Sequence, residues 1–136
     1  MVGQAQASLR NGYNTSAIKA YNQGVSLHDS KPGRAVGHYL KALEHEPFRT
    51  NALANISYLY VDLKQYAAAQ NTIERWMAVE GESGKTLELL AMTYIDRGQF
   101  DQAIEALEKA AELAGDLEEL ARIRQNLEYC RYRKQN

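Results

Sequence analysis

The chain repeats itself with a period of 34 residues. Residues of matching chemistry recur at this spacing: Tyr60 and Tyr94, Tyr66 and Phe100, Ala69 and Ala103, Ile73 and Leu107, Gly81 and Gly115. The series extends back to Ala35, Tyr39, Ala42 and Pro47. A period in this range indicates a stack of short units, none of which can bury its apolar face alone. The repeat therefore favours a binding scaffold over an enzyme.

Within each unit, apolar residues recur at helical spacing and turn residues separate the helices. Glu46-Pro47 ends one helix, because the residue before a proline disfavours helical backbone. Gly98 and Gly115 stand where the end of a helix needs a left-handed residue. Short connections make neighbouring helices antiparallel. The pattern predicts helices over 16–28, 33–45, 50–62, 66–79, 84–97, 100–114 and 117–133.

Small and large residues alternate on the faces that should meet. In the third unit, Ala91 and Ala103 let two helix backbones approach, while Tyr94 and Leu107 fill the space around them. In the first unit, Gly24 takes the small position. Each pair of helices should therefore form one layer of a continuous core.

These spacings resemble the tetratricopeptide repeat (TPR) family, whose motif reads large-x-x-Leu-small-x-x-Tyr, then Ala-x-x-x-aromatic, then Pro. The third unit carries it as Leu87, Leu90, Ala91, Tyr94, Ala103 and Leu107, with Gly115 in place of the proline. The resemblance implies an all-α fold. The expected fold is a right-handed superhelical solenoid of three helix-turn-helix TPR units, over about 16–49, 50–83 and 84–116. A capping helix and basic tail follow over 117–136.

The two ends of the chain depart from the repeat. Residues 1–15 are polar and contain two glycines, so we expect a flexible lead-in, with Thr15 or Ser16 capping the first helix. The closing helix should cover the open end of the stack with one apolar face. Its inward residues should be Leu117, Leu120, Leu127 and Cys130, with Ile123 beside them. Its water-facing residues should be Arg122, Arg124, Gln125 and Glu128. Cys130 should be a buried apolar filler instead of a reactive thiol.

The resemblance also implies a concave groove, lined by the first helix of each unit, that binds a peptide or helical segment of a partner protein. The expected groove residues are Tyr21, Asn22, Val25, Asp29, Asn51, Asn55, Tyr58, Asp62, Lys85, Leu89, Met92 and Asp96. Tyrosine and methionine suit peptide binding because they bury area and adapt in shape. Val61 and Ile95 extend this apolar strip. Asp29, Asp62 and Asp96 occupy equivalent places, which favours a basic or amide-rich partner.

Some TPR proteins clamp the C-terminal carboxylate of chaperone peptides with five lysine, asparagine and arginine side chains. Here Asn55 and Lys85 stand at matching places, but Leu89 replaces the arginine, and the first unit offers Tyr21 and Val25. Two matches of five, with acids nearby, argue against a clamp.

We find no catalytic constellation, no metal site and no cofactor motif. The three histidines, His28, His38 and His45, lack metal-ligand spacing. Residues 81–86 lack the spacing of a phosphate loop and read as a junction between units. We therefore expect no small-molecule substrate.

The net charge of −1 gives no overall attraction to nucleic acid or anionic lipid. Arg131 to Lys134 form a basic tail that we interpret as a solvated helix end. No apolar block marks a signal peptide or a membrane span, which by itself says little about the compartment. For a repeat scaffold of this kind we expect a cytoplasmic protein. The alternatives are the periplasm or a place in a larger membrane-associated protein.

Two other functions remain open from the sequence. One is self-association into a homo-oligomer or assembly, through the groove or through the edge of the first unit near Ala17, Tyr21 and Tyr39. The other is a regulatory part of a larger protein, because repeat arrays are often joined to other domains.

Overall fold

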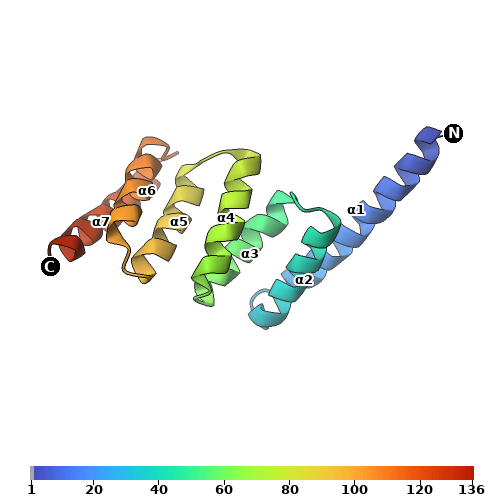
Figure 1. Cartoon of the computed structure of the whole chain (residues 1–136), viewed down its shortest axis with the longest axis horizontal. Helices are drawn as coiled ribbons and strands as arrows, with labels where there is room; N and C mark the ends of the chain where they lie inside the picture. The colour runs from blue at the N-terminus through green and yellow to red at the C-terminus, as the bar shows by residue number, and fades with distance from the viewer. Residues whose placement is uncertain (1) are drawn as a thin grey trace.

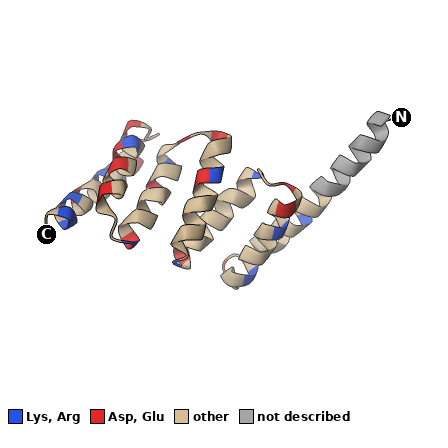
Figure 2. Ribbon diagram, viewed as in Figure 1, with Lys and Arg blue, Asp and Glu red and all other residues tan. Residues whose placement is uncertain are grey.

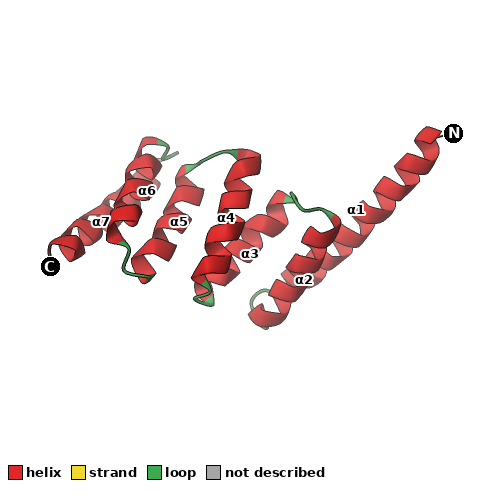
Figure 3. Ribbon diagram, in the orientation of Figure 1, coloured by secondary structure: helices red, strands yellow, loops and turns green. Residues whose placement is uncertain are grey.

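The computed structural model describes the backbone of residues 2–136 and the side chains of residues 15–136. Over this range the chain forms seven α-helices and no strand, as Figure 3 shows. The helices are α1 (Val2–Leu27), α2 (Pro32–His45), α3 (Thr50–Asp62), α4 (Tyr66–Glu80), α5 (Gly84–Asp96), α6 (Phe100–Glu112) and α7 (Leu117–Gln135). The all-α prediction is confirmed.

The helices stack in a single row from one end of the molecule to the other (Figure 1). The pairs α1/α2, α3/α4 and α5/α6 pack most closely, and α7 packs on α6. The two termini lie at opposite ends of the row. The first helices of successive units also touch, since α3 contacts α5 and α5 contacts α7. This second set of contacts places α3, α5 and α7 side by side on one surface.

Six helices begin and end within two residues of the positions expected from the sequence, but α1 does not. The helix expected over 16–28 begins at Val2, so Thr15 and Ser16 lie inside it and not at its start. Residues 2–14 contain no proline, and a glycine inside a helix costs only about 1 kcal/mol. The flexibility expected of the lead-in, and the division of the chain at residues 15, 49, 83 and 116, stay predictions.

The core consists of two clusters of buried side chains that share neighbours. One runs through α1–α4 into α5 and includes Tyr39 and Ile73, both fully buried. The other joins α5, α6 and α7 and includes Leu107. Met77 and Tyr94 pack against both clusters. Apolar packing is therefore continuous along the stack, as expected of repeats that cannot stand alone.

Two equivalent turns use left-handed backbone. Gly98 has φ 72° in the turn before α6, and Lys64, 34 residues earlier, has φ 60° in the turn before α4. Gly81, before α5, has φ 86°. The left-handed role expected of Gly98 is confirmed, but the same expectation for Gly115 is wrong. The N–H of Gly115 instead donates to the Glu119 carboxylate at 2.9 Å.

The junction before α5 is a helix cap, in agreement with the interpretation of residues 81–86. The Ser83 hydroxyl accepts from the Thr86 N–H at 3.1 Å, and the Thr86 hydroxyl accepts from the Ser83 N–H at 3.0 Å. This reciprocal pair satisfies two N–H groups at the start of the helix. It fixes the point at which α5 begins, and hence the register of the residues that α5 presents.

Helix α7 closes the stack through a stripe at helical spacing, with Ile123, Leu127 and Cys130 buried. The inward position expected for Leu117 is wrong, because its side chain is 84% exposed. Leu117 is the first residue of α7. Leu120 is half-buried. The polar face expected for Arg124, Gln125 and Glu128 is exposed, in agreement with a capping role.

Three cations of the basic tail have partners on or beside α6. Arg131 pairs with Glu108 at 3.3 Å, and Lys134 pairs with Asp101 at 2.6 Å. The Arg133 guanidinium lies over the Phe100 and Tyr129 rings, 5.2 and 5.7 Å from their centroids. Figure 2 shows the basic residues of α7 beside acidic residues of α6. The tail therefore supports the docking of α7. No described helix is both long and apolar enough to cross a membrane.

Candidate functional site: a groove lined by α3, α5 and α7

The 34-residue period brings equivalent residues of successive units into direct contact. Asn55 Nδ2 donates to the Tyr21 hydroxyl at 3.2 Å, and Arg122 donates to Glu88; both pairs are 34 residues apart. These contacts join α1 to α3 and α5 to α7. One period of the sequence thus equals one step across a surface made by the first helix of each unit.

The larger cavity on this surface lies between α3, α5 and α7 and has a volume of about 490 Å³. Its apolar part is formed by Tyr58, Leu89 and Met92. Leu89 is buried in the core, whereas Met92 is 41% exposed. Tyr58 is half-buried, with its ring edge-on to Trp76 at a centroid distance of 6.2 Å. The cavity thus has a rigid apolar floor and one adaptable side chain that is open to a partner.

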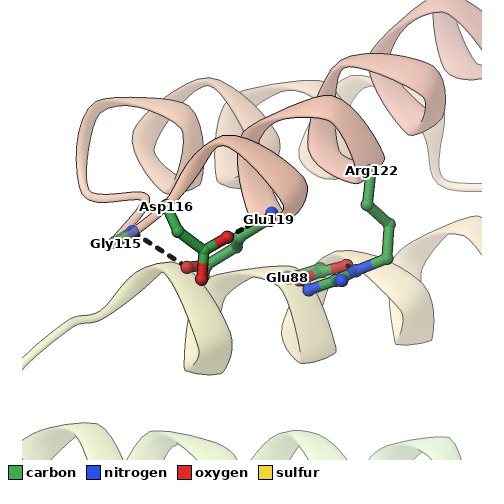
Figure 4. A network of polar contacts seen from close by, with 5 residues as sticks. All are labelled: Glu88, Gly115, Asp116, Glu119 and Arg122. Atoms are coloured by element: carbon green, nitrogen blue, oxygen red, sulfur yellow. Dashed lines mark hydrogen bonds and ion pairs between the residues drawn. The ribbon is translucent and has the colours of Figure 1, made fainter.

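A bidentate ion pair joins α7 to this floor. The Arg122 guanidinium donates through Nε to Glu88 Oε1 at 2.5 Å and through Nη2 to Glu88 Oε2 at 2.9 Å (Figure 4). Glu88 is only 8% exposed, so a cation must compensate its charge. Hydrogen bonding to Glu88, followed by its charge, raises the pKa of Arg122 above its ordinary value. The pair holds the start of α7 against α5 and forms one wall of the cavity.

Acidic residues at the start of α7 form the rest of that wall. The Asp116 carboxylate accepts from the Glu119 N–H at 2.7 Å, while the Glu119 carboxylate accepts from the Gly115 N–H (Figure 4). The positive end of the helix dipole favours both carboxylates. Glu118 lines the same cavity. On the α5 side, the Lys85 ammonium lies 5.6 Å from the Tyr58 ring centroid.

A smaller cavity of about 260 Å³ lies at the other end of the groove, lined by Val25, His28, Asp29, Tyr39 and Asn55. Tyr39 is fully buried, and its hydroxyl contacts His28 Nδ1 at 2.9 Å and Asn55 Nδ2 at 3.4 Å. Burial raises the pKa of Tyr39, partly offset by the hydrogen bond from Asn55. Asn55 thus bridges two tyrosine hydroxyls, which fixes the packing of α1 and α2 on α3.

The structure distributes the expected groove residues over three environments. Tyr58, Lys85, Leu89 and Met92 line the larger cavity, whereas Val25, Asp29 and Asn55 line the smaller one. Tyr21 lines neither cavity but packs beside the smaller one, with its ring 5.8 Å from that of Tyr39. The remaining four residues are exposed and line neither cavity: Asn22, Asn51, Asp62 and Asp96.

One expectation about the groove is wrong in detail. Val61 was expected in the apolar strip but belongs to the core. The three aspartates are all exposed but have different neighbours, since Asp29 lines a cavity and Asp96 lies beside the Tyr66 hydroxyl. Partial burial and then the Asp96 charge raise the pKa of Tyr66. Equivalent places in successive units therefore gave these residues different neighbours.

The sequence reasoning also missed the contribution of α7. Arg122 was expected to face water, and Asp116, Glu118 and Glu119 were not assigned to the groove at all. The spacing of 34 residues between Glu88 and Arg122 contained the signal, because it continues the repeat into the closing helix. The closing helix therefore acts as the first helix of a further unit.

Both residues that match the carboxylate clamp, Asn55 and Lys85, already have partners within the protein. Asn55 donates to Tyr21, and Lys85 lies over Tyr58. Among the side chains from residue 15 onward, no group of three or more His, Cys, Asp or Glu could hold a metal ion.

A row of antiparallel helix pairs with a 34-residue period, and a groove formed by the first helix of each pair, define the TPR class of repeat proteins. Comparison with known protein families also identifies a TPR protein. The family described as "Anaphase-promoting complex, cyclosome, subunit 3" matches residues 33–110, more than half of the chain. The chain belongs to this family of TPR proteins.

Individual relatives match at low identity. The "General transcriptional corepressor trfA" of Dictyostelium discoideum is 25% identical over an alignment of 103 residues. The match covers 71% of this chain and 7% of that protein. Among solved structures, "MamA 41-end" from Desulfovibrio magneticus RS-1 has a TM-score of 0.79 and 25% identity. The match covers 88% of this chain and 66% of that one. The chain thus spans less than two thirds of both relatives.

A third match is the first TPR domain of Spaghetti (RPAP3), solved in complex with the HSP90 peptide SRMEEVD. It has a TM-score of 0.69 and 20% identity, over 84% of this chain and 94% of that one. Identity at this level shows the fold alone. Taken together, the comparisons show that the chain is similar to TPR proteins, and they support a protein-interaction scaffold in general.

Proposed function

We propose that this chain is a non-catalytic adaptor that binds a segment of another protein in the groove between α3, α5 and α7. The observation that carries the proposal is the larger cavity, where the partly exposed Met92 stands over a floor of Tyr58 and Leu89. An apolar cavity with a few polar groups at its edge is the usual form of a binding site.

The energetics fit a side chain of a partner as the anchor. Full burial of one large apolar side chain contributes about 1.5–3 kcal/mol. The floor is already packed against the core, so its ordering cost has been met by folding. The solved complex of the RPAP3 domain with a peptide supports this use of the fold.

Met92 is the residue to substitute in a test, because Tyr58 also packs on the core and its loss would disturb folding. Met92→Gln keeps the length of the side chain and removes its apolar character. Val79→Gln on α4 is the matched control, since Val79 is 44% exposed and lines neither groove cavity. Circular dichroism would verify that both variants keep wild-type helicity.

The experiment is affinity capture from a lysate of the native host, followed by mass spectrometry. We expect a partner that wild type and Val79→Gln retain and that Met92→Gln loses, with affinity reduced roughly tenfold for one lost apolar contact. Equal capture by all three proteins would contradict the proposal, because the partner would then bind elsewhere.

A further inference from the structure

Charges around the larger cavity are unbalanced. Four carboxylates line it, those of Glu88, Asp116, Glu118 and Glu119, against two cations, Lys85 and Arg122. The Arg122 guanidinium donates two hydrogen bonds to the Glu88 carboxylate, so this pair is neutral as a unit. Asp116 and Glu119 accept backbone N–H groups but keep their full charge. The wall formed by α7 is therefore negative.

Lys85 and Glu118, which carry opposite charges, differ in how available they are to a partner. The Lys85 ammonium is held over the Tyr58 ring. Glu118 is exposed, and among residues 15–136 no cation lies within ion-pair distance of it. Glu118 and Glu119 thus present negative charge next to the apolar floor. Asp29 gives the smaller cavity the same sign.

We infer that the groove selects a basic amphipathic segment of a partner protein, an inference that rests on the function proposed above. An apolar side chain of this segment packs on Met92 and Tyr58. A lysine or arginine next to it reaches Glu118 and Glu119 at the start of α7. Complementary charge then sets the register of the segment and speeds its association.

The positive end of the α7 dipole, equivalent to about half a charge, stabilises these acids and offsets only part of their negative charge. An acidic segment would meet three carboxylates at the α7 wall, whereas of the two cations that line the cavity Arg122 is paired with Glu88 and Lys85 lies over the Tyr58 ring. Repulsion between the carboxylates of the wall and those of an acidic segment opposes binding. The charge of the wall, more than its shape, distinguishes a basic from an acidic partner.

The probe is a random peptide library displayed on phage and selected on the wild-type protein. We expect the enriched peptides to contain lysine or arginine next to a large apolar residue. The best peptide is then synthesised with a fluorophore, together with a version in which glutamate replaces each basic residue. Fluorescence anisotropy should show binding of the first and about tenfold or greater weakening of the second.

Glu118→Lys tests the wall itself, with Glu112→Lys on α6 as the matched control. Both acids are exposed, and only Glu118 lines the cavity. We expect Glu118→Lys to weaken the peptide about five- to tenfold at low salt and less at high salt, since salt screens exposed charges. Glu112→Lys should leave the affinity within about twofold.

The outcomes separate this inference from the function on which it rests. Enriched peptides that depend on Met92 but are acidic or uncharged would overturn the basic partner and leave the groove in place. An equal effect of Glu118→Lys and Glu112→Lys would do the same. Peptides that bind Met92→Gln as well as wild type, or a selection that enriches nothing, would contradict the groove and the inference together.

Discussion

Replacing Gly24 with alanine should destabilise the protein, although alanine is the better helix former. Gly24 lies in α1, where it faces the fully buried Tyr39 ring of α2. A Cβ atom at Gly24 would lie 2.6 Å from Tyr39 Cε1 and 2.7 Å from Cδ1. The ring cannot swing away freely, because its hydroxyl contacts His28 and Asn55. Either the ring or the whole α1/α2 interface must move.

The expected magnitude is the difference between two effects. Overpacking a well-packed core costs about 1–3 kcal/mol, and a contact this short on a buried ring belongs in the upper part of that range. Replacing glycine by alanine inside a helix returns about 1 kcal/mol. The net loss of unfolding free energy should therefore be about 1–2 kcal/mol. For a chain of this size, that corresponds to a fall in Tm of roughly 3–8 °C.

Gly37→Ala is the matched control for this prediction. Gly37 lies inside α2, and a Cβ atom there would meet nothing within 4 Å. Thermal and urea unfolding followed by circular dichroism should show Gly37→Ala gaining about 0.5–1 kcal/mol. Equal gains in stability for both variants would refute the reasoning, because Gly24 would then not be held against Tyr39.

Three further predictions concern single residues. Lys64→Gly should raise the free energy of unfolding, measured with urea, by roughly 0.5–1 kcal/mol, because glycine adopts left-handed backbone without strain, as Gly98 does at the equivalent turn of the next unit. No increase would contradict this. The hydrogen bond from Trp76 lowers the pKa of Glu80, so the bond should persist above pH 4.5 and be lost on acidification below it. The fluorescence of this single tryptophan should report that loss with a midpoint below 4.5, and Glu80→Gln should abolish the transition. Burial raises the pKa of the Cys130 thiol above 9.0, so its contribution to stability should fall as the pH rises past that value. Its reaction with a thiol reagent near pH 8 should be at least about tenfold slower in the folded than in the urea-unfolded protein.

The sequence predicted most of the fold because local and long-range signals coincide. Turn residues and helical periodicity locate each helix, and the 34-residue period then states which faces meet. Gly24 is an example, since the sequence assigns it to the small position of a helix contact and the structure packs it against the Tyr39 ring. The start of α1 could not be predicted in the same way, because residues 2–14 contain neither a strong stop signal nor the repeat.

The groove was predictable in position but not in composition. The period placed Tyr58 and Met92 on the correct helices, and both line the larger cavity. The period does not determine how deeply a side chain is buried, which is why Val61 was assigned to the groove and not to the core. Treating α7 only as a cap hid the role of Arg122, because water-facing and groove-facing positions look alike on a helix with no successor.

The central claim is that a partner segment binds on the surface formed by α3, α5 and α7. The most direct measurement is the amide NMR spectrum of isotope-labelled protein, recorded during titration with the best peptide from the phage selection. The account predicts shifts concentrated at residues 55–62, 85–96 and 118–122, and their loss in Met92→Gln. Shifts concentrated instead on α4 and α6, and unchanged by Met92→Gln, would contradict it.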